Sequence, residues 1–137
     1  MIGHCLLSAI AIAFIFSASF PASADETVIQ RWYEALLAVD RAALSAVLAE
    51  DARIRLNDLG IEQTKAEFIA SMDEWQGAVA GAQIRHKVEA AQGKMTTVVA
   101  CYDFPQNDIL MRETFSISDG LITENTQATV AEDCASY

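Results

Sequence analysis

The second half of the chain carries ionisable side chains inside otherwise apolar segments. Glu113 lies between Met111 and Phe115, and His86 has Ile84 and Val88 as its alternate neighbours. A carboxylate buried beside a second carboxylate has a raised pKa, and such a group can exchange protons near neutral pH. Glu113 and His86 are therefore the candidate catalytic residues of this chain.

Aromatic and polar residues expected near these two groups complete a candidate pocket. Its predicted lining is Trp32, Tyr33, Trp75, His86, Tyr102, Glu113, Glu124 and Thr126. Most of them have a structural alternative: Glu113 could pair with Arg31, Glu124 could tilt to solvent, and His86 could be a core or rim histidine. The aromatic residues near the N-terminal helices could simply be core.

The residues that several types of catalytic or metal site require are absent from the sequence. Only two histidines occur, and there is no G-x-S-x-G elbow, so a Ser-His-Asp triad is not expected. A zinc site needs a cluster of His and Cys ligands, and nucleotide loops need G-x-G-x-x-G or Walker sequences, which are missing. The sequence predicts no metal and no cofactor, although an all-carboxylate metal site stays open.

Length and charge restrict the class further. The 137 residues fit one domain, and 53% of them are hydrophobic, which favours a folded chain over a disordered one. Nine basic residues against nineteen acidic ones give a net charge of −10. This deficit of cations argues against binding nucleic acid or anionic lipid.

The first 24 residues resemble a cleaved secretory signal. An apolar run, Leu6–Phe16, precedes the A-x-A site Ala22-Ser23-Ala24. We expect a signal peptide over residues 1–24, a single domain over 25–137, a periplasmic or secreted location, and no membrane attachment after cleavage. An uncleaved N-terminal anchor is the alternative.

The expected mature chain contains two cysteines, Cys101 and Cys134. An even count in an exported chain indicates a structural disulfide, with two free thiols or a reactive cysteine as alternatives. The predicted register places Cys101 on the outer sheet face, near the end of the last strand. The tail from Val130 to Cys134 is long enough to reach it.

Three helices and a strand are predicted before residue 82. Apolar spacing predicts a helix over 25–39, and Asp40 is an N-cap for a second, short helix. Residues 53–56 read as a strand. Thr64 and Glu67 form a capping box that begins a third helix, running to about Gln76.

From Ala82 the apolar period changes to two, and three turn signals define an antiparallel meander. Asp119-Gly120 is typical of a two-residue hairpin. The turns predict these cross-strand pairs: Ile117 with Ile122, Phe115 with Glu124, Glu113 with Thr126, Tyr102 with Met111, Ala100 with Glu113, and His86 with Val98. Together the elements predict an α+β fold, a cone-shaped barrel with three N-terminal helices packed on a curved, mostly antiparallel sheet.

This order of elements resembles the nuclear transport factor 2-like superfamily, in particular its SnoaL-like branch. The resemblance rests on residues 29–36 (IQRWYEAL), Asp40, residues 48–52 (LAEDA) and residues 115–122 (FSISDGLI). It covers about residues 26–131. It implies a cone in which helices and sheet enclose one pocket. In this family a homodimer often forms through the outer sheet face, which is predicted to be polar here.

Residue correspondences with ketosteroid isomerase, a member of this superfamily, are partial. Glu113 falls about where that enzyme has its protonated oxyanion-hole acid. Trp32 stands in place of its catalytic tyrosine, and Leu56, with Asn57 and Asp58 beside it, in place of its general base. Two of the three positions differ, so isomerisation of ketosteroids is not expected.

Three functions remain open. The first is an exported domain that binds a small apolar molecule in the cone. The second is an acid/base enzyme of the isomerase, cyclase or dehydratase type that uses Glu113 or His86. The third is a non-catalytic dimerisation or interaction module whose cavity is filled by its own side chains.

Overall fold

The computed structural model describes residues 23–137. The predicted signal peptide lies almost wholly outside the described residues; its last two positions, Ser23 and Ala24, cap and begin the first helix. The elements follow in the order α1 (Ala24–Ala38), α2 (Arg41–Val47), β1 (Leu48–Leu56), the 3-10 turn η1 (Asn57–Leu59), β2 (Ile61–Thr64), α3 (Lys65–Val79), β3 (Gln83–Gln92), β4 (Met95–Asp103), β5 (Asp108–Ser118) and β6 (Leu121–Ala131).

Each of the three α-helices begins at a side-chain cap that accepts from a free backbone amide of its first turn. Asp40 accepts from the amide of Ala43, and Thr64 forms the predicted capping box with Glu67. Both caps confirm the sequence prediction. The third helix runs three residues further than predicted, to Val79. No helix among residues 23–137 is long and apolar enough to cross a membrane.

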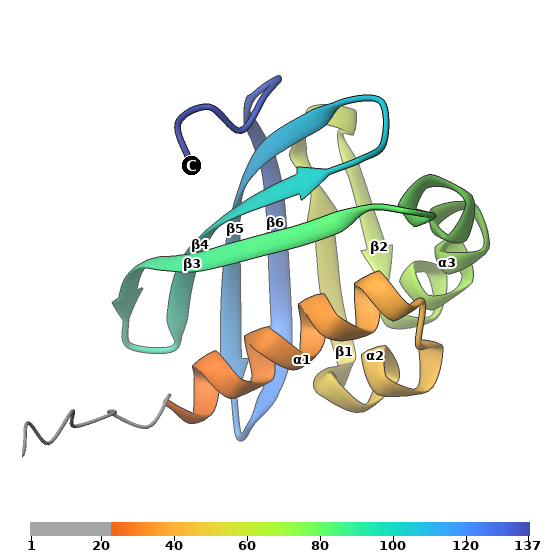
Figure 1. The fold of residues 1–137 in the computed structure, drawn as a ribbon. Coiled ribbons are helices and arrows are strands. Elements are labelled where there is room, and N and C mark those ends of the chain that lie inside the picture. Colours follow the sequence, from red (N-terminus) through yellow and green to blue (C-terminus); the bar gives the residue numbers. More distant parts are fainter. Residues whose placement is uncertain (1–22) are drawn as a thin grey trace, which may run out of the picture.

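The six strands form one open sheet in the order β2-β1-β6-β5-β4-β3. All neighbours are antiparallel except β1 and β6, which run parallel. The three helices lie along one face of this curved sheet, as Figure 1 shows. The α+β class, the three helices and the mostly antiparallel sheet are as predicted. The sequence prediction missed β2 and the first half of β1.

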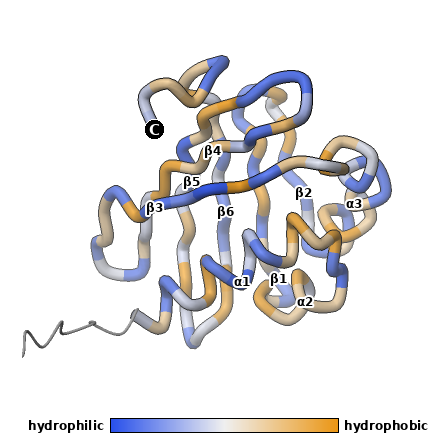
Figure 2. The backbone as a smooth tube through the Cα atoms, viewed as in Figure 1, coloured by the Kyte–Doolittle hydropathy of each residue, from blue (hydrophilic) through white to orange (hydrophobic). Residues whose placement is uncertain are grey.

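Hydrophobic and hydrophilic residues alternate along the strands (Figure 2). The inward side chains meet the helices in one core, whose fully buried large members include Trp32, Phe115, Ile29, Leu44, Ile54 and Ile122. Trp32 stacks on Phe68 with ring centroids 5.0 Å apart, and it meets Phe115 edge-on. The alternation therefore fixes which face of the sheet the helices cover.

Two predicted registers differ by two residues from the structure. Glu113 pairs with Val98 rather than Ala100, and His86 pairs with Ala100 rather than Val98. A shift of two residues leaves every side chain on its predicted face, because successive side chains alternate. The predicted inner face of β3, β4 and β5 is therefore correct.

The register of β6 was predicted wrongly. Ile117 pairs with Ile122 as expected, across a turn in which Asp119 and Gly120 both have positive φ. A bulge at Thr123 follows, and Ser116 then pairs with Glu124. Because side chains alternate, one extra residue moves the side chains that follow it to the opposite face of the sheet. Asn125 and Gln127 lie on the inner face, and Glu124 and Thr126 do not.

A second, smaller cluster occupies the outer face of the sheet. Val99, Cys101 and Leu110 are buried there, and the C-terminal tail packs on them through Ala131, Cys134 and Tyr137. Cys101 and Cys134 form the predicted disulfide, with Cα atoms 5.7 Å apart. The tail crosses the back of the sheet as predicted.

Candidate functional site

Among residues 23–137, Glu113 is the one carboxylate that the fold buries completely. It lies on β5 with 0% of its surface exposed. The Tyr102 hydroxyl, from β4, donates to its Oε1 atom, and Asn125 Nδ2, from β6, donates to its Oε2 atom at 3.2 Å. Gln127 Nε2 in turn donates to Asn125 Oδ1 at 2.7 Å. The carboxylate thus sits inside a polar network built from three adjacent strands.

Burial dominates the electrostatics of this group. Removal from water raises the pKa of Glu113 to about 7, although the hydrogen bonds that it accepts act in the opposite direction. The same burial and the adjacent carboxylate raise the pKa of Tyr102 and of Tyr33. The Tyr33 hydroxyl faces Glu113 but does not meet hydrogen-bond geometry, and it has no partner among the described residues.

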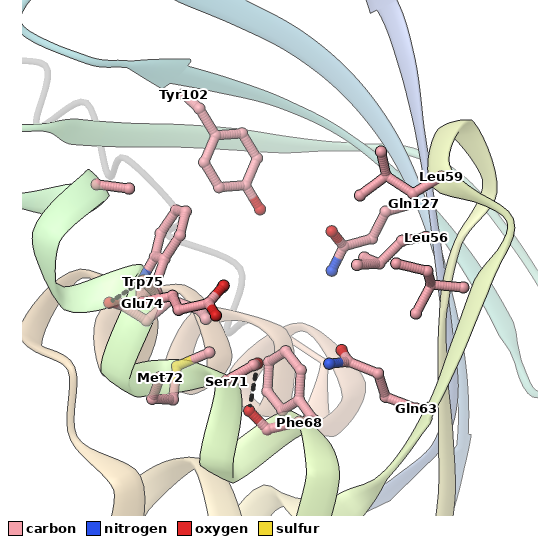
Figure 3. Close-up of a pocket in the computed structure, with 13 residues that line it drawn as sticks. Leu56, Leu59, Gln63, Phe68, Ser71, Met72, Glu74, Trp75, Tyr102 and Gln127 are labelled. Carbon is pink, nitrogen blue, oxygen red and sulfur yellow. Dashed lines mark hydrogen bonds between the residues drawn. The ribbon is translucent and has the colours of Figure 1, made fainter.

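A cavity of about 420 Å³ opens between α3 and the β1–η1–β2 region of the sheet. Figure 3 shows side chains from both sides pointing into it. Its lining is Leu36, Leu56, Leu59, Ile61, Gln63, Phe68, Ser71, Met72, Glu74, Trp75, Ala78, Tyr102 and Gln127. Mostly apolar walls with a few polar groups are typical of a small-molecule site.

Tyr102 and Gln127 belong both to this lining and to the network around Glu113. Glu113 itself is not among the lining residues. A bound molecule would therefore contact the buried carboxylate only through Tyr102, or through Gln127 and Asn125. The arrangement can hold a polar group of a ligand against the sheet and can couple it to the protonation of Glu113.

Two of the aromatic candidates line this pocket, and two do not. Trp75 and Tyr102 are in its wall, with ring centroids 6.1 Å apart. Trp32 and Tyr33 both extend from α1 into the core, where they are 0% and 3% exposed. The core alternative thus describes both residues, although the Tyr33 hydroxyl also faces Glu113.

The other candidates lie outside the pocket. His86 stacks on Tyr33 at 4.4 Å between ring centroids, and partial burial lowers its pKa. Glu124 was predicted on the inner face, but the bulge at Thr123 turns it outward. Its side chain is 47% exposed and bonds to Arg55. Thr126 is displaced in the same way and pairs with Thr114. The alternative pairing of Glu113 with Arg31 does not occur; Arg31 is exposed.

Asn125 and Gln127 are the site residues that sequence reasoning placed on the wrong face. Residues 123–127 are all polar, so no apolar alternation reveals the bulge. The contribution of α3 to the pocket lining, through Phe68, Met72 and Glu74, was also missed. Helix periodicity shows which side of a helix is apolar, but it does not show where a cavity remains between the helix and the sheet. The burial of Asn125 shows on which face each of residues 124–127 lies, and this burial is visible only in the structure.

One group of three metal-ligating side chains occurs within residues 23–137, namely Cys101, Asp108 and Cys134. Both sulfur atoms are joined in the disulfide, and Asp108 accepts a hydrogen bond from the amide of Cys134. The group therefore fastens the tail to the sheet, and its sulfur atoms are not free to coordinate an ion.

No family model and no curated protein sequence matches the chain. Solved structures do match it. A nuclear transport factor 2-like protein of unknown function from Burkholderia xenovorans matches with TM-score 0.67 and 15% identity, over 81% of this chain and 84% of that one. A protein with a ketosteroid isomerase-like fold from Catenulispora acidiphila, solved with trimethylamine, matches with TM-score 0.62 and 13% identity, over 77% and 87%.

An LEH-like epoxide hydrolase from Mycobacterium tuberculosis matches with TM-score 0.58 and 15% identity, over 77% of this chain and 82% of that one. These structures share the fold described above. The chain therefore has the nuclear transport factor 2-like fold.

Proposed function

We propose that this chain is an exported domain that binds a small, mainly apolar molecule in the pocket between α3 and the sheet. The observation that carries the proposal is the cavity of about 420 Å³ in which apolar walls converge on Tyr102 and Gln127. Small-molecule sites commonly have volumes of about 300–1,000 Å³ and this mixture of walls. The trimethylamine complex of a protein with the same fold adds support.

Filling the cavity tests this proposal. Ala78 is an exposed residue of α3 that lines the pocket, whereas Ala70 is an exposed residue of the same helix outside the lining. We expect Ala78→Trp to abolish binding of Nile red, a neutral apolar dye, and Ala70→Trp to leave it unchanged. Equal binding by the two variants, or no binding by the wild-type protein, would contradict the proposal.

An acid/base enzyme is the second candidate, and one observation favours it. Glu113 has a pKa of about 7 and is bonded to Tyr102, whose ring lines the pocket. A proton could pass between Glu113 and a substrate through the Tyr102 hydroxyl, with one O–H bond broken as the next is formed. His86 stacks on Tyr33 outside the pocket lining and takes no part in this route.

Glu113→Gln separates the two candidates. The glutamine side chain keeps the size of the group and can still accept from Tyr102, but it cannot ionise. A binding domain keeps its affinity for a neutral ligand in this variant, whereas an enzyme of this type loses turnover. The third function, an interaction module with a filled cavity, would require the space beside Trp75 to be closed.

A further inference from the structure

Three polar side chains of the pocket have their hydrogen-bond donors committed to the protein. Trp75 Nε1 donates to the carbonyl of Leu36 at 2.8 Å, and Ser71 Oγ donates to the carbonyl of Phe68 at 2.6 Å. The hydroxyl proton of Tyr102 is directed at Glu113. An indole has one donor and a hydroxyl has one donor, so these three groups have none left for a ligand.

The network around Glu113 also fixes the orientation of Gln127. Asn125 uses its Nδ2 to donate to the carboxylate, so its Oδ1 must accept, and Gln127 supplies the proton from Nε2. The Oε1 atom of Gln127 is left as an acceptor at the pocket wall. The lone pairs of Tyr102 Oη and Ser71 Oγ are acceptors as well. The remaining donors are the second Nε2 hydrogen of Gln127 and the amide of Gln63.

The charge of the pocket has one sign. The Glu74 carboxylate points into the cavity from α3 (Figure 3). No lysine or arginine belongs to the lining of this pocket within the described part of the chain. Glu113 stands behind Tyr102, and the whole chain carries a net charge of −10. An anionic ligand would meet the Glu74 carboxylate, and above about pH 7 the ionised Glu113 as well, with no counter-ion in the lining, which costs free energy.

Aromatic faces complete the walls. Phe68, Trp75 and Tyr102 all line the cavity. The faces of aromatic rings attract cations, most strongly when water is excluded. The pocket thus combines hydrogen-bond acceptors, a carboxylate at its mouth, and π surfaces. The acceptors favour a hydrogen-bond donor, and the carboxylate and the aromatic rings favour a positive charge.

Building on the small-molecule binding proposed above, we propose that the ligand is a protonated organic amine with an apolar body. The ammonium group donates to Tyr102 Oη and Gln127 Oε1 and lies within the field of Glu74, while its hydrocarbon part contacts Leu56, Phe68 and Trp75. The recognition chemistry is that of an alkyl- or arylalkylammonium ion.

Three matched probes test this inference: phenethylammonium, phenethyl alcohol and phenylpropionate. They have similar apolar bodies and carry a positive, a neutral and a negative head group. The purified protein is titrated with each, and the side-chain N–H signals of Gln127, Gln63 and Trp75 are followed by NMR. We expect the ammonium to bind about tenfold more tightly than the alcohol, with shifts at these signals, and the carboxylate to bind most weakly.

Two variants test which carboxylate strengthens the binding of the ammonium probe. Glu74→Gln removes the carboxylate at the mouth, and Asp73→Asn removes the neighbouring charge, which lies outside the lining and bonds to Arg41. We expect Glu74→Gln to weaken ammonium binding about threefold without changing alcohol binding, and Asp73→Asn to do neither.

The outcomes separate the two proposals. If the alcohol or the carboxylate binds as tightly as the ammonium at the same signals, the cationic ligand is wrong and the binding pocket stands. If none of the three probes shifts these signals across the millimolar range, and Nile red does not bind either, both proposals are wrong.

Discussion

A single buried carboxylate organises the polar part of the molecule. Glu113 is tolerated at zero exposure because Tyr102 and Asn125 donate to its two oxygen atoms. Its position on the inner face was predictable, since it interrupts an apolar alternation. Its partner Tyr102 was predicted on the same face, and the Tyr102 hydroxyl reaches Glu113 although Glu113 pairs with Val98, four residues away along β4. Asn125 could not be predicted, because its side of the sheet depends on a bulge.

The raised pKa of Glu113 makes stability depend on pH in a defined direction. Between its ordinary pKa of 4.5 and about 7, the folded state holds a proton that the unfolded state releases. The free energy of unfolding therefore falls as pH rises through this window, by roughly 3 kcal/mol in total. Chemical denaturation at a series of pH values measures it.

Glu113→Gln is the matched control for this dependence. His86, with a lowered pKa, acts in the opposite direction near its ordinary value of 6.5. The pKa values of Asp58, Glu67 and Glu89 are lowered in the folded state, so these groups change the free energy of unfolding in more acidic solution. Subtracting the curve of the Gln variant from that of the wild type removes these contributions. A flat difference between pH 4.5 and 7 would show that Glu113 titrates normally.

At the scale of elements, one bulge decides which residues reach the site. The extra residue Thr123 moves Asn125 and Gln127 inward and Glu124 outward. Helix caps, hairpin turns and strand alternation were predictable, because each depends on a few neighbouring residues. The bulge was not, since a polar segment gives no preference between the two faces. The strand β2 was missed because its four residues have no apolar pattern.

The hydroxyl of Thr123 helps to hold this bulge. Its Oγ1 donates to the carbonyl of Ser116 at 3.1 Å. We expect Thr123→Val, which keeps the shape and removes the donor, to lower the free energy of unfolding by about 1 kcal/mol. Thr123→Ser keeps the donor and should cost less. If urea denaturation showed the same loss of unfolding free energy for the two variants, the hydrogen bond would contribute nothing to stability.

At the scale of the whole molecule, the tail completes the outer side of the sheet. Arg85 and Lys87 lie over the ring of Tyr137 at 4.7 and 4.4 Å, and the disulfide joins Cys134 to Cys101 of β4. The charges of Arg55 and Arg112 are paired with Glu62 and Glu89 on this face. The overall architecture was predictable because three turns and the apolar alternation agree on one inner face.

Removing the disulfide should lower the free energy of unfolding. It closes a loop with a sequence separation of 33 residues, and the loop-closure model assigns about 3–4 kcal/mol to such a cross-link. We expect the double variant Cys101→Ala, Cys134→Ala to lose this amount in denaturant titrations. Reductant should destabilise the wild type similarly and leave the double variant unchanged. An effect of reductant on both proteins would assign the loss to another cause.

The cavity between α3 and the sheet is the central claim, and native mass spectrometry of the protein purified without unfolding tests it most directly. The account predicts a mass increase from a co-purified small molecule in the wild-type protein and in Ala70→Trp, and its absence in Ala78→Trp. A wild-type spectrum with no bound molecule, or a molecule retained in Ala78→Trp, would contradict it.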